Sequence, residues 1–304
     1  MSYKAVVARI TALGGGTLGT FSVADAVALG VSRKQLAALR EARVIERVFP
    51  GVYRVEAVPP SNEQYLRAAL AWAGPGAVAA GSSAGELYAL EGVAARVPEI
   101  VVPAHRRARS DAVVVHRTHD RAALMVRSIR GIPVTGIEPT LVALAHRLAG
   151  EAFEIACEDA RRRRLTSVAA MQAFLDRWGR RGRPGVAATR ALMSELDPRH
   201  ASRSALEVKA RRLLVANGFC DFVREFPLGW KGRTYRYDFG FPAACAILET
   251  NGRRWHDDPN DYEYDNEKWS VPARHGFRIV FATWAKVTRT PGALLAEVEA
   301  ALRR

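Results

Sequence analysis

The stretch from Tyr235 to Glu249 constrains the fold of this 304-residue chain more than any other. It begins with alternating large apolar and polar residues, the period-two pattern of a strand with one buried face. A break at Gly240-Phe241-Pro242 is followed by the apolar run Ala243–Leu248, typical of a strand buried on both faces. The two runs predict neighbouring strands of one sheet in an α/β domain.

Each of these predicted strands carries a carboxylate, Asp238 in the first and Glu249 at the end of the second. We expect both at the same end of the sheet, where they would bind Mg²⁺, a hard cation that takes carboxylate oxygens, water and phosphate. Such an ion activates water and stabilises a leaving oxygen in phosphodiester hydrolysis. His256, beyond the turn signal Asn251-Gly252, is a candidate general acid or base because imidazole titrates near neutral pH.

Residues 202–304 resemble the restriction-endonuclease-like fold in its very-short-patch-repair form, as found in the DUF559 family. The resemblance is carried by these segments: Ala205-Leu206-Glu207, Tyr237-Asp238-Phe239, Ile247-Leu248-Glu249, Asn251-Gly252 with His256, Asp265 to Lys268, and His275 to Val280. It implies a Mg²⁺-dependent DNA endonuclease with Asp238 and Glu249 as metal ligands, Glu207 assisting and His256 moving the proton. Asn251 departs from the pattern, because the wider superfamily has lysine there and DUF559 sequences usually have aspartate.

Other residues around this predicted site have two interpretations each. Glu207 either approaches the metal or pairs with Arg211 one helical turn away. Arg253 and Arg254 either bind the scissile phosphate or face solvent. Asp265 and Lys268 form a one-turn helix pair and are a weaker site candidate. We expect Trp284 and a helix from Pro291 to Leu302 to close the core.

The first 60 residues predict a winged helix. Ser22 and Ser32 are N-cap residues for helices at Ser22–Leu29 and Arg33–Ala42, separated by a glycine turn. Two runs rich in β-branched residues around Pro50-Gly51 then predict a hairpin, the wing. A basic, well-capped second helix is typical of a helix-turn-helix, although a small winged helix can also dock proteins.

This segment resembles the winged-helix domain of the AbiEi antitoxins of type IV toxin–antitoxin systems. The resemblance is carried by Gly30-Val31-Ser32, Leu36, Leu39 and Ile45 to Tyr53. It implies a second helix that enters the major groove of DNA and a wing that meets phosphates. The residues implied are Ser32, Arg33, Lys34 and Gln35 on the helix, and Arg47 and Arg54 on the wing.

The predicted organisation is therefore multi-domain α/β: a winged helix (1–60), a mixed α/β middle domain (61–198) and a restriction-endonuclease-like domain (199–304). In the middle domain, Ile100–Val102 and Val113–Val115 predict paired strands, and 179–185 predict an exposed basic loop able to touch a phosphate backbone or to act as a linker. No metal spacing is evident among its histidines.

Composition indicates a polyanionic partner, with 45 Lys and Arg against 31 Asp and Glu and a net charge of +14. Only six of the 45 are lysine, so a GC-rich coding sequence competes as the explanation. Three widely spaced cysteines fit a reducing cytoplasm, and neither a signal peptide nor an apolar run of membrane-spanning length is evident.

Three functions remain open from the sequence. The first is a Mg²⁺-dependent DNA endonuclease. The second is a non-catalytic AbiEi-like antitoxin and transcriptional autorepressor, whose cognate nucleotidyltransferase-type toxin would be a genetic rather than a physical partner; Asn251 favours this view. The third is recognition of mismatched or branched DNA without cleavage.

Overall fold

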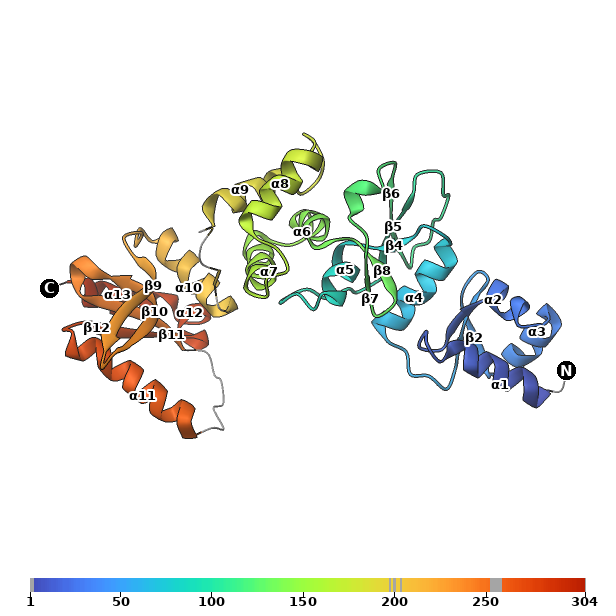
Figure 1. Ribbon diagram of the computed structural model, residues 1–304, viewed down its shortest axis with the longest axis horizontal. Helices are drawn as coiled ribbons and strands as arrows, with labels where there is room; N and C mark the ends of the chain where they lie inside the picture. Colours follow the sequence, from blue (N-terminus) through green and yellow to red (C-terminus); the bar gives the residue numbers. More distant parts are fainter. Residues whose placement is uncertain (1–2, 197, 199–200, 203, 252–258, 304) are drawn as a thin grey trace. The chain divides into compact units, whose positions relative to one another are not determined.

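The computed structural model describes residues 3–196, 198, 201–202, 204–251 and 259–303, apart from the side chains of 259–265. The chain forms two compact units (Figure 1). Unit 1 comprises Met1–Ala156 and Arg164–Glu195, and unit 2 comprises Cys157–Arg163 and Leu196–Arg304. Both mix helices with sheets, so the α/β class is confirmed. None of the described helices is long and apolar enough to cross a membrane.

Unit 1 begins with three helices around a small antiparallel sheet of order β1-β3-β2. Capping boxes start α2 and α3, because Ser22 and Ser32 each exchange hydrogen bonds with the residue three positions later. Helix α1 was not predicted from the sequence. The elements are α1 (Tyr3–Gly14), β1 (Thr20–Ser22), α2 (Val23–Ala28), α3 (Arg33–Glu41), β2 (Ile45–Phe49) and β3 (Val52–Val55).

The middle of unit 1 is a five-stranded mixed sheet of order β6-β5-β4-β8-β7. The predicted pairing of Ile100–Val102 with Val113–Val115 is confirmed as the parallel pair β5–β6. Phe49 and Val52 of the wing pack in the same core as Leu66 and Ile100. The elements are α4 (Asn62–Ala73), β4 (Val78–Ala79), α5 (Gly81–Leu87), β5 (Glu99–Pro103), β6 (Val114–Thr118), β7 (Arg127–Ile129), β8 (Ile132–Val134) and α6 (Ile137–Ala145).

Three helices follow the middle sheet: α7 (Gly150–Arg162), α8 (Val168–Trp178) and α9 (Val186–Glu195). The buried faces of α8 and α9 are apolar, with Met171, Phe174 and Leu192 among their core residues. α7 begins in unit 1 and ends in unit 2, whose share of the helix starts at Cys157. The division into segments 1–60, 61–198 and 199–304 stays a prediction.

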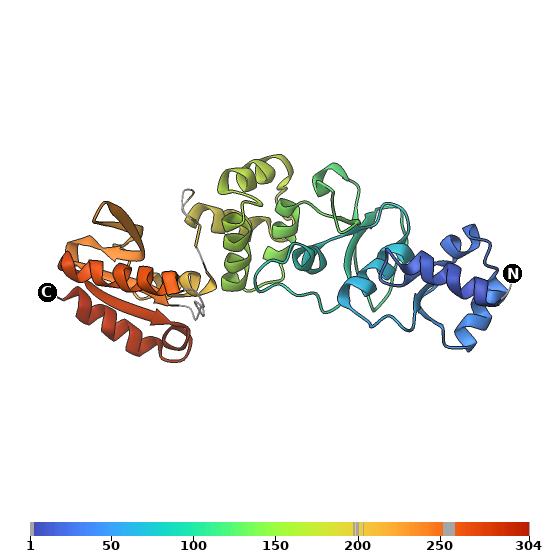
Figure 2. The same cartoon turned by 60° about the horizontal axis from the view of Figure 1, so that its bottom comes forward.

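Unit 2 has a four-stranded mixed sheet of order β12-β11-β10-β9, in which only β11 and β12 run parallel. Residues of α10, α12 and α13 pack on one face with Leu248, and Val271 of α11 packs on the other with Ile247. Figure 2 shows α11 in orange and α13 in dark red. The elements are α10 (Ala205–Ala216), β9 (Val223–Trp230), β10 (Arg233–Phe241), β11 (Ala246–Asn251), α11 (Pro259–Arg274), β12 (Arg278–Thr283), α12 (Trp284–Thr288) and α13 (Pro291–Leu302).

The break between the two key strands lies later than predicted. Gly240 and Phe241 remain in β10, paired with Ile247 and Ala246, and the chain turns at Pro242–Cys245. A Cβ atom on Gly240 would lie 2.2 Å from the ring of Phe226, so glycine here makes room for a neighbouring side chain. The predicted two-sided burial of β11 is confirmed.

Trp284 does not close the core. Its side chain is 51% exposed, and Lys209 Nζ lies 5.6 Å from the centre of its ring. The helix Pro291–Leu302 does close it, through Leu294, Val298 and Ala301.

Candidate functional site

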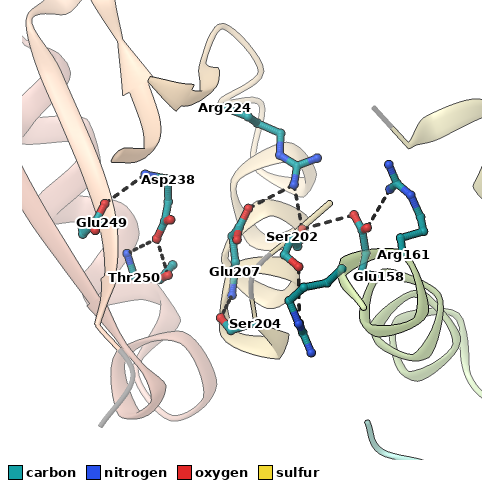
Figure 3. Close-up of polar contacts among 10 residues, drawn as sticks. Glu158, Arg161, Ser202, Ser204, Glu207, Arg224, Asp238, Glu249 and Thr250 are labelled. Atoms are coloured by element: carbon teal, nitrogen blue, oxygen red, sulfur yellow. Dashed lines mark hydrogen bonds and ion pairs between the residues drawn. The ribbon is translucent and has the colours of Figure 1, made fainter. Parts of the chain in front are cut away.

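Asp238 and Glu249 lie together on the adjacent strands β10 and β11 (Figure 3). In the register between β10 and β11, Phe239 pairs with Leu248, and Asp238 and Glu249 are the next residues of the two strands. Asp238 N donates a hydrogen bond to Glu249 Oε2 (3.0 Å). Thr250 N donates to Asp238 Oδ2 (2.8 Å), and Thr250 Oγ1 donates to the same oxygen. Each acid therefore accepts a hydrogen bond from the neighbouring strand.

A lysine from helix α11 completes this acid pair. Lys268 Nζ forms an ion pair with Glu249 Oε1, and the two side chains are only 13% and 9% exposed. Tyr237 contacts the lysine twice. Its hydroxyl donates a hydrogen bond to Lys268 O (2.6 Å), and the centre of its ring lies 5.3 Å from Lys268 Nζ. A positive charge therefore reaches the pair from a helix, whereas position 251 at the end of β11 is an exposed asparagine.

The environment of Glu249 changes its acidity. Burial and the neighbouring negative charge of Asp238 raise its pKa to about 7, against the opposing effects of Lys268 and of the hydrogen bond from Asp238 N. Near neutral pH this carboxyl group is therefore close to its own titration midpoint. A cation that binds the pair favours the ionised form, so its affinity must increase as pH rises through this range.

Glu207 belongs to a different polar network. It is 1% exposed, its backbone N–H bonds the N-cap Ser204 Oγ (3.2 Å), and its carboxylate accepts a hydrogen bond from Arg224 Nη2 (3.1 Å). Arg224 Nη2 also donates to Ser202 Oγ (2.9 Å), which donates to Glu158 Oε1 (3.3 Å). Figure 3 shows this chain of contacts running from Glu207 to α7.

Within the described residues, no third His, Cys, Asp or Glu side chain joins Asp238 and Glu249. No group of three or more His, Cys, Asp or Glu side chains suited to a metal occurs in that part of the chain. His256, Arg253 and Arg254, which the sequence analysis placed at this site, lie outside the described residues.

The second candidate surface is the exposed face of α3. Arg33 and Lys34 are exposed, while Leu36 and Leu39 are buried. Ser32 and Gln35, predicted to face DNA, are joined to each other by the capping box, in which Gln35 Oε1 accepts a hydrogen bond from Ser32 N (2.8 Å). Their first role is to start the helix that presents the two cations.

The wing carries one exposed arginine and one that is held in place. Arg47 is exposed on β2. Arg54, predicted to meet phosphate, is 14% exposed and forms an ion pair with Glu46, directly opposite on β2 (2.6 Å). Its Nη1 also donates to Val58 O (3.0 Å). This guanidinium braces the hairpin.

One known family matches within the first segment of the chain. Residues 10–55 match the family described as transcriptional regulator, AbiEi antitoxin. The AbiEi-type match extends from the last turns of α1 to the end of β3 and therefore includes α3 and the wing.

No curated protein matches the chain. Among solved structures, the crystal structure of the RV2827C protein from Mycobacterium tuberculosis aligns with 74% of this chain and 89% of its own, at 18% identity and a TM-score of 0.43.

Proposed function

We propose that this chain is a DNA-binding transcriptional regulator that uses its AbiEi-type winged helix to place α3 in the major groove. The observation that carries the proposal is the family match over 10–55, which includes the exposed basic face of α3. The net charge of +14 adds sequence-independent attraction to phosphates. An antitoxin of this type would repress its own promoter, next to the gene of a nucleotidyltransferase-type toxin.

Fluorescence anisotropy with DNA from upstream of the gene tests this function. We expect Arg33→Glu and Lys34→Glu each to weaken binding and to lower the slope of log K against log salt concentration by roughly 0.9 per lost phosphate contact. Arg289→Glu changes the net charge equally at an exposed position in unit 2 and is the matched control. Unchanged affinity in both α3 variants would refute the assignment.

A second candidate function, a Mg²⁺-dependent DNA endonuclease in unit 2, is favoured by the arrangement of Asp238, Glu249 and Lys268. Two neighbouring carboxylates fit Mg²⁺, which commonly takes one or two carboxylates and otherwise water and phosphate. Bound there, the ion would supply an activated water and charge stabilisation. Lys268 would neutralise Glu249 in the free protein and be positioned beside a scissile phosphate.

Cleavage of supercoiled plasmid by the full chain, with and without Mg²⁺, tests this second function. We expect Asp238→Asn and Glu249→Gln to reduce nicking by on the order of 100-fold or more. Glu267→Gln, which removes the neighbouring acid that bonds Tyr235, is the control and should cleave normally. If the chain binds its promoter but nicks no plasmid, unit 2 is a nuclease-like scaffold without cleavage activity. Titration with branched or mismatched DNA would then test whether unit 2 recognises such DNA without cutting it.

A further inference from the structure

A cavity of about 790 Å³ lies in unit 1, on the side of the middle sheet where β5 and β6 meet α6 and the turn after α8. Neither proposed function uses it. Its volume lies in the range of pockets that bury small organic ligands. Its lining is unusual in charge: three histidines and four arginines face two acids, the charged residues being Arg117, Arg147, Arg180, Arg183, Glu99 and Asp120.

The acid at the floor of the cavity is fully engaged by its own surroundings. Glu99 is 2% exposed and accepts hydrogen bonds from Ser82 N (2.8 Å) and His116 Nε2 (2.8 Å). Arg147 Nε forms an ion pair with the same carboxylate (3.0 Å). Burial alone would raise the pKa of Glu99, but these hydrogen bonds and the charge of Arg147 lower it overall. The negative charge of Glu99 is therefore balanced by Arg147 and by the hydrogen bonds that its carboxylate accepts.

The carboxylate of Glu99 lies against the start of α5. A Cβ atom on Gly81 would lie 2.1 Å from the carboxyl carbon, and Gly81 has a φ of +49°. Glycine at this position lets the acid lie directly on the first turn of the helix. The backbone of Gly81 and Ser82 therefore fixes the position of the Glu99 carboxylate.

The arginines of the rim are not compensated in the same way. Arg180 and Arg183 lie in the turn that follows α8, and within the described residues neither forms an ion pair. Arg183 donates to Trp178 O (3.3 Å). Burial lowers the pKa of Arg183 most, the negative charge of Asp120 opposes this shift, and the like charge of Arg180 adds a smaller lowering. The exposed Arg180 and the half-buried Arg183 place two like charges near each other beside the single acid Asp120, and this excess of positive charge attracts an anion.

The lining of the same cavity also includes apolar side chains, which suit a ring. Trp178, Leu124, Val101 and Pro139 contribute to it. A metal does not suit the site, because no group of metal-binding side chains occurs in the described part of the chain, despite the histidines. The cavity is also larger than inorganic phosphate needs, so the chemistry indicates an anionic group attached to an apolar ring.

We propose that this cavity binds a nucleoside monophosphate, with its phosphate at Arg180 and Arg183 and its base along the apolar wall beside Trp178. Arginine suits this role because its planar guanidinium donates two parallel hydrogen bonds to phosphate oxygens. The site would give unit 1 a small-molecule ligand distinct from DNA.

Isothermal titration calorimetry on the full chain tests the proposal with nucleoside 5′-monophosphates, the matching nucleosides and inorganic phosphate. We expect saturable binding of at least one monophosphate, with the nucleoside binding roughly tenfold or more weaker. Arg180→Met and Arg183→Met should each weaken monophosphate binding to a similar degree. Arg107→Met, at an exposed position of the same unit outside the cavity, is the matched control.

Arg180 makes no side-chain hydrogen bond within the described residues, so Arg180→Met tests the site even if Arg183→Met fails to fold. The absence of binding at millimolar monophosphate, equal affinity for nucleoside and monophosphate, or unchanged affinity in Arg180→Met would each overturn the proposal. Displacement of the bound monophosphate by duplex DNA would overturn it too, because the rim would then serve polynucleotide phosphates.

Discussion

Glu249 is a buried acid with another acid on one side and a lysine on the other. Its pKa of about 7 lies above the roughly 4.3 of an unfolded glutamate. Between these two values the folded chain holds a proton that the unfolded chain has lost. The free energy of unfolding is therefore expected to fall as pH rises through this window, by on the order of a few kcal/mol.

We expect Glu249→Gln to flatten this pH dependence. Lys268→Met should instead move the fall in stability to higher pH, because the ion pair that lowers the pKa of Glu249 is removed. Hydrogen–deuterium exchange of peptides covering β10 and β11, corrected for the intrinsic rate at each pH, reports the local stability. Glu267→Gln should behave as wild type. Protection of β11 that increases with pH would contradict the assignment.

Residues of the candidate site differ in how far sequence alone could place them. Asp238 and Glu249 could be predicted, since their strands are adjacent in the chain and a short connection makes antiparallel neighbours. Lys268 lies 19 residues beyond Glu249, and its approach depends on how α11 packs on the sheet. The Glu207–Arg224 contact likewise depends on tertiary packing.

At the scale of elements, capping residues and period-two strands were predictable because their signals are local. The two capping boxes, the hairpin around Pro50-Gly51 and the helix Pro291–Leu302 all follow from short-range chemistry. The extension of β10 through Gly240 was not predictable, since it depends on Phe226 of the neighbouring strand. Helices α1, α9 and α12 were not predicted from the sequence.

The two arginines of the wing, Arg54 and Arg47, allow a structural role to be distinguished from a DNA-contacting role. We expect Arg54→Met to lower the free energy of unfolding by about 1 kcal/mol, because Glu46 and Val58 O lose a partly buried charged partner. Its neighbour Arg47 is exposed, so Arg47→Met should leave stability unchanged and reduce the salt dependence of DNA binding. Urea unfolding and anisotropy titrations of both variants measure the difference. The reverse pattern would return Arg54 to a DNA-contacting role.

At the scale of the whole molecule, the chain is divided inside a helix. Residues 157–163 of the α7 region belong to unit 2, where Glu158 accepts from the fully buried Ser202 and Arg162 donates to Ser202 O (3.4 Å). A cut at residue 198, the predicted domain boundary, separates this segment from Ser202.

Separate fragments 1–198 and 199–304 should therefore each lose local stability. We expect amides of residues 157–163 in the first fragment, and those around Ser202 in the second, to exchange on the order of tenfold faster than in the full chain. Peptides covering α4 are the internal control. Equal exchange in fragments and full chain would show that the segment does not depend on unit 2.

The sequence by itself determined the α/β class, the capped basic helix with its wing, and the two strands that bring Asp238 and Glu249 together. These features depend on neighbours within a few residues or across one turn, and local propensity and periodicity report them. Only the tertiary structure decided that Lys268 reaches Glu249, that Glu207 turns to Arg224, that Arg54 braces the wing and that Glu99 floors a basic cavity. Those contacts join residues distant in sequence, and the packing of helices on sheets, which no local pattern encodes, sets them.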